Sequence, residues 1–361
     1  MSHAYNPTDL VLVTGANGHV AQHVVDQLLA LPTGPRVRAT VRSNTTATQI
    51  TNFYKDKDHA KNRLQVVVVP DIVVPGAFDD AVKDVTHIAH IASPLIIGAK
   101  DIANELLKPA MQGTVGILSS ALKSPTVQAV VVTSSFGSVF DPKRGWRSGY
   151  KYTSADWNPI TFEEAASPDL DLDSYPETWR PYITYCASKA VAERAAWDFQ
   201  TAHSPHFTLS FILPTYIGGP NILPLAHANP ASSLSFSQLL IYNTATDPVA
   251  LPKMDWPGWV DVRDVARAHL NALVTPAAAG KRWIVSAGMA SYEDIADVVR
   301  RRFPTLTPSS ETQRIEHYTI DASPALHALG LGTYIPLEKM VVDTLRDVVG
   351  KDGRAIDSPI A

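Results

Sequence analysis

A tyrosine and a lysine four residues apart are the side chains of this sequence best suited to acid–base chemistry. They are Tyr185 and Lys189 in the pentapeptide YCASK, and on a helix this spacing places both on one face. A nearby ammonium lowers the pKa of a phenol from its usual value near 10, which makes tyrosine a usable acid and base near neutral pH. Of the 12 tyrosines only Tyr185 has a lysine at this spacing, but chance alone would give roughly one such pair in two chains. Its place in the fold therefore matters more than the motif.

Two serines offer a hydrogen-bond donor for the same chemistry. AVVVTSSF is typical of a buried strand, and Ser134 and Ser135 stand at its carboxyl end, where doubly wound sheets bind their ligands. A hydroxyl at this point can donate to a developing alkoxide. Serines at strand ends also form turns, so a structural role is the alternative.

The single cysteine, Cys186, lies between Tyr185 and Lys189 and invites interpretation as a nucleophile. No histidine stands beside it in the sequence to act as its base, so we expect a small buried hydrophobic side chain. One cysteine cannot form an internal disulfide, which favours a reducing compartment.

His87 and His90 of HIAH lie on opposite faces of a strand, and we predict no metal site.

A glycine pattern follows the first predicted strand. LVLVTGANGHVAQHVVDQLL places Gly15 and Gly18 between a strand and a helix, where glycines let the backbone approach a pyrophosphate and the helix N-terminus holds it. The pattern is G-x-x-G-x-x-A, with Ala21 as the third small residue, so its first two glycines are spaced differently from G-x-G-x-x-G. We predict nucleotide binding here, with a plain structural turn as the alternative.

The residues after the second predicted strand favour a phosphorylated ribose. NAD-binding proteins usually carry an acidic residue about 20 positions past the glycines, yet none occurs between Asp26 and Asp56. Arg42 lies there instead, and a guanidinium suits a 2′-phosphate. We therefore predict NADPH/NADP+ as the cofactor, the alternative being that Arg42 is a surface residue. Asp71, after the third strand, can accept from an adenine amino group or cap a helix.

The composition is that of an ordinary globular protein. The 361 residues are 45% hydrophobic with a formal net charge of −4, and the one tight basic cluster, Arg300–Arg302, is typical of a solvated helix end. We expect no nucleic-acid partner. No apolar run approaches the roughly 18 residues needed to cross a bilayer, and the N-terminus lacks the pattern of a signal peptide. We expect a cytoplasmic protein without a membrane partner.

The first half alternates β-branched runs with segments of helical period, which predicts parallel strands buried on both faces. The fold class is thus α/β, a doubly wound parallel sheet (Rossmann) with a smaller C-terminal substrate-binding domain. We expect the dinucleotide-binding domain over residues 1–213, rejoined by 259–275, and the substrate-binding cap over 214–258 and 276–361. The predicted strands of the first half are Leu10–Thr14, Arg36–Val41, Leu64–Val69, His87–Ile91 and Ala129–Thr133.

These motifs together resemble the extended short-chain dehydrogenase/reductases. TGANGHVA, TVRS, VPDI, HIASP, VVTSSFGSV, YCASK, LPTYIGGPN and WVDVRDVARAHL occur in that order and at that family's spacings, over nearly the whole chain. More narrowly, they resemble the dihydroflavonol-reductase-like branch and its fungal and yeast NADPH-dependent carbonyl reductases of methylglyoxal, aldehyde and ketone type.

The resemblance implies a Ser–Tyr–Lys site. Ser135 and Tyr185 would hold the carbonyl oxygen, Tyr185 would donate the proton, and Lys189 would hold the nicotinamide ribose and lower the Tyr185 pKa. The implied cofactor contacts are Gly15, Asn17, Gly18, His19, Val20, Arg42, Asp71, Ile72, Ala92, Ser93, Thr133, Tyr185, Lys189, Pro214, Thr215, Tyr216 and Ile217. From their positions along the chain, the candidate substrate contacts are Pro94, Phe136 and Tyr216.

Three residues depart from the family pattern. His19 stands where Phe or Ile is usual, and SNTTAT after Arg42 lacks a second basic residue that often supports the 2′-phosphate. Gly116 replaces an Asn that is frequent in relatives.

We predict an NADPH-dependent carbonyl reductase that converts a ketone or aldehyde, hydrophobic in character, to an alcohol. The alternatives are a nucleotide-sugar epimerase or dehydratase that retains NAD, and a non-catalytic dinucleotide sensor on the same fold. Helices after the fourth and fifth strands leave a homodimer open, although no residue requires one.

Overall fold

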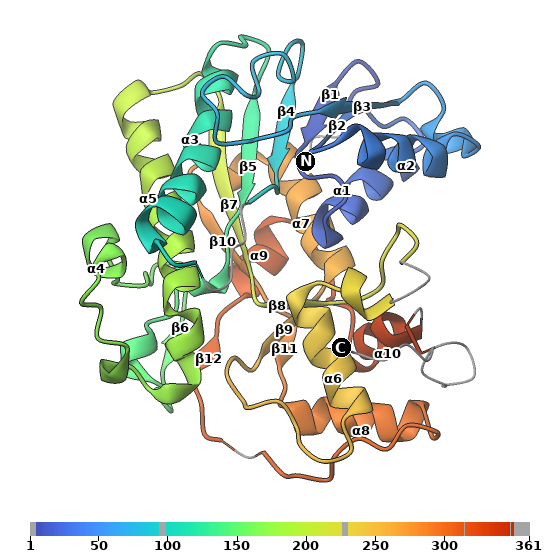
Figure 1. The fold of residues 1–361 in the computed structure, drawn as a ribbon. Coiled ribbons are helices and arrows are strands. Elements are labelled where there is room, and N and C mark those ends of the chain that lie inside the picture. The colour runs from blue at the N-terminus through green and yellow to red at the C-terminus, as the bar shows by residue number, and fades with distance from the viewer. Residues whose placement is uncertain (1–4, 94–98, 226–229, 314, 347, 350–361) are drawn as a thin grey trace.

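The computed structural model describes residues 5–93, 99–225, 230–313, 315–346, 348 and 349. Within these residues seven parallel strands form one sheet in the order β10-β7-β5-β4-β1-β2-β3 (Figure 1). The order reverses between β1 and β4, which confirms the predicted doubly wound sheet. The strands are β1 (Leu10–Val13), β2 (Arg36–Val41), β3 (Leu64–Val68), β4 (His87–His90), β5 (Ala129–Thr133), β7 (Thr208–Pro214) and β10 (Arg282–Val285).

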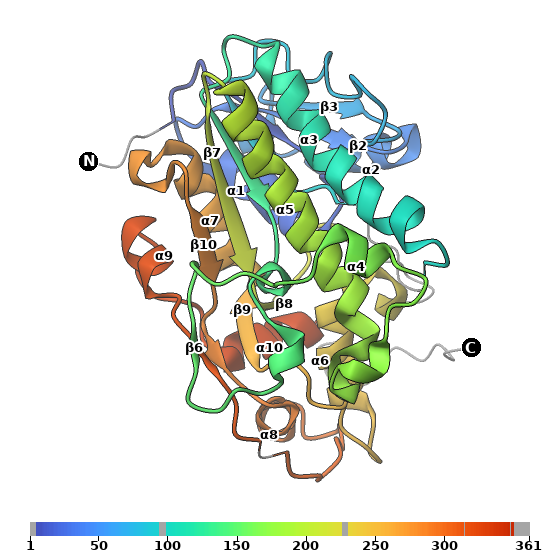
Figure 2. The same cartoon turned by 90° about the vertical axis from the view of Figure 1, so that its left-hand side faces the viewer.

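Helices cover both faces of this sheet, which is why its strands are hydrophobic at successive positions. Along β1, Leu10 and Leu12 belong to one core cluster, whereas Val11 and Val13 belong to the other. Helices α3 (Lys108–Leu122) and α5 (Ile183–His203) lie side by side over the first face, as Figure 2 shows. Over the second face pack α1 (His19–Ala30) and α7 (Val262–Val274). A π-helical segment, Ile102–Leu107, leads into α3, and α2 (Asn44–Tyr54) joins β2 to β3.

A smaller unit lies beyond the carboxyl ends of the strands (Figure 1). It contains a sheet of β8 (Tyr216–Gly218), β9 (Gly258–Asp261) and β11 (Gly288–Met289), and the helices α6 (Phe236–Thr246), α8 (Tyr292–Arg302) and α10 (Leu337–Arg346). These helices share a third core cluster. A capping box opens α8, with Ser291 accepting from the Asp294 backbone N–H.

Two short strands and two short helices lie among the remaining described residues. Strands β6 (Lys151–Tyr152) and β12 (Thr319–Ile320) pair in parallel, and α4 (Phe162–Ala166) and α9 (Ser323–Ala328) are short helices. None of the helices in the described ranges is both long and apolar enough to span a bilayer.

One strand lies outside the unit in which the expected domain division placed it. Residues 276–361 were expected in the cap, but β10 pairs with β7 at the edge of the large sheet. Ile284 enters the core on one face of that sheet, while Trp283 and Val285 enter the core on the other face. A strand with apolar side chains on both faces requires helices on both sides, and only the large sheet provides them. We therefore assign β10 to the dinucleotide-binding unit.

Candidate functional site

The predicted site residues follow four strands that are neighbours in the sheet. Gly15 comes after β1, Ser93 after β4, Ser135 after β5 and Thr215 after β7. Because parallel strands end at the same edge, this topology brings the four segments together. Thr14 links the ends of β1 and β4, because its Oγ1 accepts hydrogen bonds from the backbone N–H groups of Ile91 (2.9 Å) and Ala92 (3.0 Å).

The glycine loop has the geometry that a pyrophosphate requires. Gly15 adopts φ +68°, and a Cβ on it would lie 3.1 Å from the Ala92 Cα, so a larger residue there would be strained. Gly18 is the N-cap of α1, and neither a capping side chain nor an acidic first-turn residue occupies that helix start. The first N–H groups of α1 therefore keep their capacity to bind an anion. This loop fits the phosphates of a dinucleotide.

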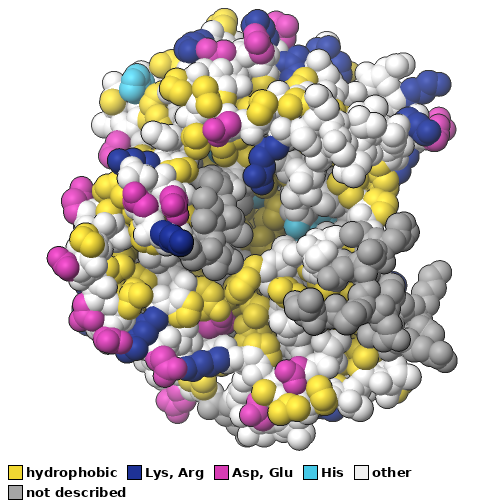
Figure 3. Space-filling view, in the orientation of Figure 1, with side chains coloured by type: hydrophobic (Ala, Val, Ile, Leu, Met, Phe, Trp, Pro, Cys, Tyr) yellow, Lys and Arg dark blue, Asp and Glu magenta, His cyan; other side chains and the backbone are white. Residues whose placement is uncertain are grey.

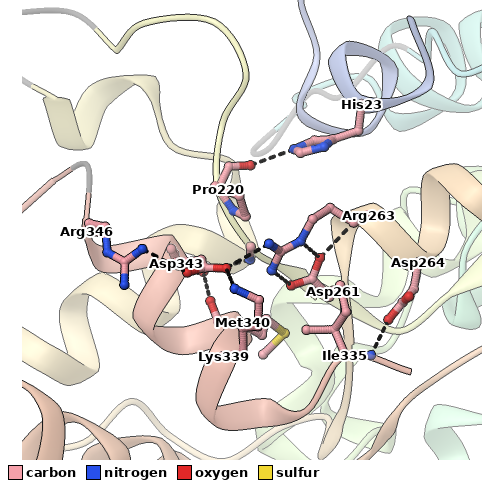
Figure 4. A network of polar contacts seen from close by, with 12 residues as sticks. His23, Pro220, Asp261, Arg263, Asp264, Ile335, Lys339, Met340, Asp343 and Arg346 are labelled. Carbon is pink, nitrogen blue, oxygen red and sulfur yellow. Dashed lines mark hydrogen bonds and ion pairs between the residues drawn. The ribbon is translucent and has the colours of Figure 1, made fainter. Parts of the chain in front are cut away.

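His19 connects the glycine loop to the smaller unit. Its Nε2 lies 3.1 Å from the Pro220 carbonyl oxygen. His23 Nε2 lies 2.8 Å from the same oxygen, as Figure 4 shows. Burial, together with the nearby His23 ring, lowers the pKa of His19 to about 3. The imidazole is therefore neutral at physiological pH and donates from Nε2. This contact gives the departure at position 19 a physical role.

An ion-pair network around the buried carboxylates of Asp261 and Asp343 holds the smaller unit in place next to this contact. Arg263, at the start of α7, contacts Asp261 (2.7 Å) and Asp343 of α10 (2.8 Å), as Figure 4 shows. Gly219, next to Pro220, donates its backbone N–H to Thr344 Oγ1 at 2.7 Å. The segment that follows β8 is thus fixed between α1 and α10.

Arg42 and Asp71 lie at the ends of the next two strands along the sheet. Arg42 is exposed directly after β2, and no hydrogen bond or ion pair between described residues engages its guanidinium. The Asp71 carboxylate is exposed, and its Oδ1 accepts a hydrogen bond from the Val73 backbone N–H at 3.0 Å. Both residues follow strands on the β2–β3 side of β1, the strand that leads into the glycine loop.

Ser135, Tyr185 and Lys189 converge at the ends of β5 and β4. Ser135 caps the turn Phe136–Ser138 by accepting from the Gly137 N–H at 3.0 Å, and it is hydrogen-bonded to Tyr185. Lys189 Nζ donates to Ser93 Oγ at 2.9 Å and lies 5.8 Å from the centre of the Tyr185 ring. The neighbouring Ser134 instead donates to buried Glu193 at 2.9 Å, so Ser135 is the serine presented to Tyr185.

The protonation of this trio differs from the sequence-based expectation. Burial raises the pKa of Tyr185 to about 12, and only its hydrogen bond with Ser135 opposes that effect. Burial also lowers the pKa of Lys189 to about 8. In the protein alone, burial therefore outweighs the expected lowering of the Tyr185 pKa by Lys189. Tyr185 keeps its proton, which is the state a proton donor needs.

The remaining predicted cofactor residues are placed around these strand ends with different exposure. Asn17 is exposed, Ile72 and Ile217 are half-buried, and Val20 and Pro214 are buried. Two further hydroxyls are already engaged: Thr133 Oγ1 lies 2.7 Å from His269 Nε2, and Thr215 Oγ1 lies 3.3 Å from Ser286 Oγ.

The three predicted substrate residues differ in where their side chains lie. Pro94 lies outside the described residues. Phe136 is 3% exposed and stacks on Tyr318 (5.8 Å between ring centres), so its ring lies in the core and not on an open surface. Tyr216 is half-buried, and its hydroxyl donates to Asp255 at 2.7 Å. Figure 3 shows hydrophobic side chains in the hollow between the strand ends and the smaller unit.

Asp255 is a polar centre that sequence reasoning missed. Its carboxylate is 2% exposed and accepts from the hydroxyls of Tyr216 (2.7 Å) and Tyr292 (3.0 Å), with Tyr182 as a further hydrogen-bond partner. These residues come from separate segments, so no local spacing signals the cluster. Cys186 is 1% exposed, as expected, and burial raises the pKa of its thiol. No group of three or more metal-ligating side chains occurs among the residues described.

Comparisons with known proteins identify relatives of this chain. Residues 12–149 match the model of the 3-beta hydroxysteroid dehydrogenase/isomerase family. The NADPH-dependent methylglyoxal reductase of Saccharomyces cerevisiae is 32% identical over 363 residues, which cover 95% of this chain and 99% of that protein. Aldehyde reductase 2 of Sporidiobolus salmonicolor is 33% identical over 348 residues, covering 95% and 96%. The crystal structure of yeast methylglyoxal/isovaleraldehyde reductase complexed with NADPH has a TM-score of 0.83 at 30% identity, covering 96% of this chain and 99% of that chain.

Proposed function

This chain belongs to the extended short-chain dehydrogenase/reductase family, in its 3-beta hydroxysteroid dehydrogenase-like group, and we propose that its NADPH-dependent carbonyl reduction proceeds through Ser135, Tyr185 and Lys189. The observation that carries this assignment is the convergence of the three side chains at one sheet edge. Tyr185 is protonated and hydrogen-bonded to Ser135, while the Lys189 ammonium is held on Ser93.

The residues of the chain divide the chemistry among them. When bound, NADPH supplies the hydride that forms the new C–H bond at the carbonyl carbon. The Ser135 hydroxyl donates to the carbonyl oxygen, where negative charge develops. Tyr185 transfers its phenolic proton to that oxygen, which completes the alcohol and leaves a phenolate. The Lys189 ammonium, buried beside the tyrosine ring, stabilises that phenolate.

The cofactor fits features of this chain. Gly15 leaves the space that a side chain would fill, and the start of α1 offers uncapped N–H groups without an opposing carboxylate. Arg42 supplies a positive charge at the end of β2, where a 2′-phosphate would need one.

The substrate class follows from the aromatic side chains near Tyr185. Tyr182 lies 4.8 Å from Trp256 between ring centres, and Trp256 lies 5.7 Å from Tyr216. Apolar walls of this kind favour a hydrophobic aldehyde, ketone or keto ester, whose burial removes apolar surface from water. We also propose a cytosolic location, supported by a lone, buried and unpaired cysteine.

Cofactor oxidation tests the proposal directly. Purified protein is mixed with NADPH or NADH and, in separate assays, with methylglyoxal, an aliphatic aldehyde, an aryl ketone and a β-keto ester. We expect turnover with NADPH, faster than with NADH, and a preference for the more hydrophobic carbonyls. Protein that purifies with stoichiometric NAD and reduces none of these would instead support the nucleotide-sugar alternative. Protein that binds NADPH without any turnover would support a sensor.

A further inference from the structure

A buried ion pair lies directly behind the turn that carries Ser135. Glu193 is on α5, one turn after Lys189, and Arg282 opens the edge strand β10. Arg282 Nε donates to Glu193 Oε1 at 2.5 Å, and the two side chains are 8% and 0% exposed. Burying two charges in this way costs free energy unless each remaining lone pair and N–H group has a hydrogen-bond partner.

The second oxygen of Glu193 holds the Ser135 turn. Ser134 Oγ donates to Glu193 Oε2 at 2.9 Å, and Ser138 Oγ lies 2.7 Å from the same oxygen. Ser138 Oγ also lies 2.9 Å from the Ser135 carbonyl oxygen, and the Ser138 N–H donates to that carbonyl at 2.9 Å. The residues before and after Ser135 are thus fixed to the helix that carries Tyr185 and Lys189.

Arg282 fixes the same turn from the other side. Its Nη1 donates to the carbonyl oxygens of Ser154 (2.8 Å) and Asp156 (2.6 Å), and its guanidinium stacks 3.5 Å from the centre of the Trp157 ring. The next residue, Asn158, donates its N–H to the Ser138 carbonyl oxygen at 2.9 Å and its side-chain N–H to that of Gly137 at 3.0 Å. Both partners of the ion pair are therefore connected to the Ser135 turn, Glu193 through two serine hydroxyls and Arg282 through the Ser138 carbonyl and residues 154–158.

We propose that the Glu193–Arg282 ion pair positions Ser135 for catalysis, an inference that rests on the proposed role of Ser135. A hydroxyl that stabilises a developing alkoxide must be held at a defined distance from Tyr185, and misplacement by about 1 Å can cost on the order of 100-fold in rate. The pair provides this restraint because its carboxylate joins α5 to both ends of the turn. Neither charged group touches the substrate, so both are positioning residues.

A double-mutant cycle in kcat tests this role. Glu193→Gln keeps the side-chain volume but replaces one acceptor oxygen with an amide NH2 group that only donates, so the serine hydroxyls and Arg282 can no longer all be satisfied. We expect Glu193→Gln to lower kcat by about 10-fold while the Kd for NADPH, measured by cofactor fluorescence, stays unchanged. In the Ser135→Ala background the same substitution should have no further effect on kcat, because the hydroxyl that the pair positions is gone.

Two additional variants guard against simple loss of stability. Ser138→Ala removes a hydroxyl that contacts both Glu193 Oε2 (2.7 Å) and Arg282 Nη2 (3.2 Å) but keeps the direct contact between Arg282 Nε and Glu193 Oε1. We expect a smaller kcat loss that also vanishes with Ser135→Ala. Arg63→Gln is the matched control, because Arg63 donates to five backbone carbonyls at 2.9–3.4 Å at the opposite end of the sheet. Arg63→Gln should lower the free energy of unfolding and leave kcat unchanged.

The outcomes separate this inference from the proposed function. If Ser135→Ala keeps the parental kcat, the catalytic role of Ser135 is wrong, and the positioning role is wrong with it. If Ser135→Ala loses activity but folded Glu193→Gln and Ser138→Ala keep theirs, the positioning role alone is overturned. Equal kcat losses from Glu193→Gln with and without Ser135 would also overturn it, because the effect would then not pass through that hydroxyl.

Discussion

Lys189 Nζ donates a hydrogen bond to Ser93 Oγ at 2.9 Å, which joins helix α5 to the end of strand β4 across 96 residues of sequence. The bond places the ammonium beside the strand end that packs against Gly15 through Ala92. The charged end of the lysine is thereby aimed at the edge where the cofactor is expected, and not along the surface of its own helix.

Tyr185→Phe should lower kcat at least about 100-fold, because the substitution removes the proton donor and nothing else. NADPH binding and the circular dichroism spectrum should be unchanged. Tyr54→Phe is a suitable control because it also removes a phenolic hydroxyl. That hydroxyl donates an ordinary hydrogen bond to Asp26 on the far side of α1. Near-normal turnover by Tyr185→Phe would remove this residue from the mechanism.

Lys189 should give the stability of the cofactor-free protein a specific pH dependence. Burial lowers its pKa from 10.5 to about 8 in the folded state, so between these values the unfolded chain binds a proton that the folded chain does not. The free energy of unfolding should therefore contain a contribution that rises with pH across this window. Urea unfolding from pH 7 to 10 should show that Lys189→Met loses this rise. Parallel curves for the two proteins would contradict the assignment.

Arg42→Glu should weaken NADPH binding much more than NADH binding, because it places a carboxylate where a 2′-phosphate would sit. Titration of each cofactor by fluorescence measures both affinities. Arg36→Glu is the matched control: Arg36 is exposed on the same strand but at its amino end, away from the site. Equal losses for NADPH and NADH in Arg42→Glu would defeat the cofactor assignment.

The sequence predicted where those candidate site residues lie in the fold whose position depends on local order along the chain. A buried strand followed by serines fixes Ser135 at a carboxyl end, and helical spacing fixes Lys189 relative to Tyr185. Strand ends matched to within one residue at β1, β3 and β4, since apolar runs mark burial well. Each of these features depends only on residues that are close by in the sequence.

The contacts that join distant segments could not be predicted in this way. Glu193 and Arg282 are 89 residues apart, and nothing in either local pattern identifies the other as its partner. Asp255 likewise gathers tyrosines from separate elements. The segment RWIV has the pattern of a strand, but pattern alone does not decide which sheet it joins. The inward position of Phe136 depends on packing against Tyr318, which lies far along the chain.

Cys186→Ala should leave kcat within about threefold of the parental value, the scale of a modest packing change near a site, whereas loss of a true nucleophile costs several orders of magnitude. The thiol is 1% exposed, and burial raises its pKa, so it remains uncharged at neutral pH. A Cβ on Gly137 would lie 3.2 Å from its sulfur, so this atom fills space behind the Ser135 turn. A maleimide should therefore fail to label the folded protein and should label one site per chain after unfolding. Rapid labelling of the folded protein with parallel loss of activity would show instead that the thiol is reactive and exposed.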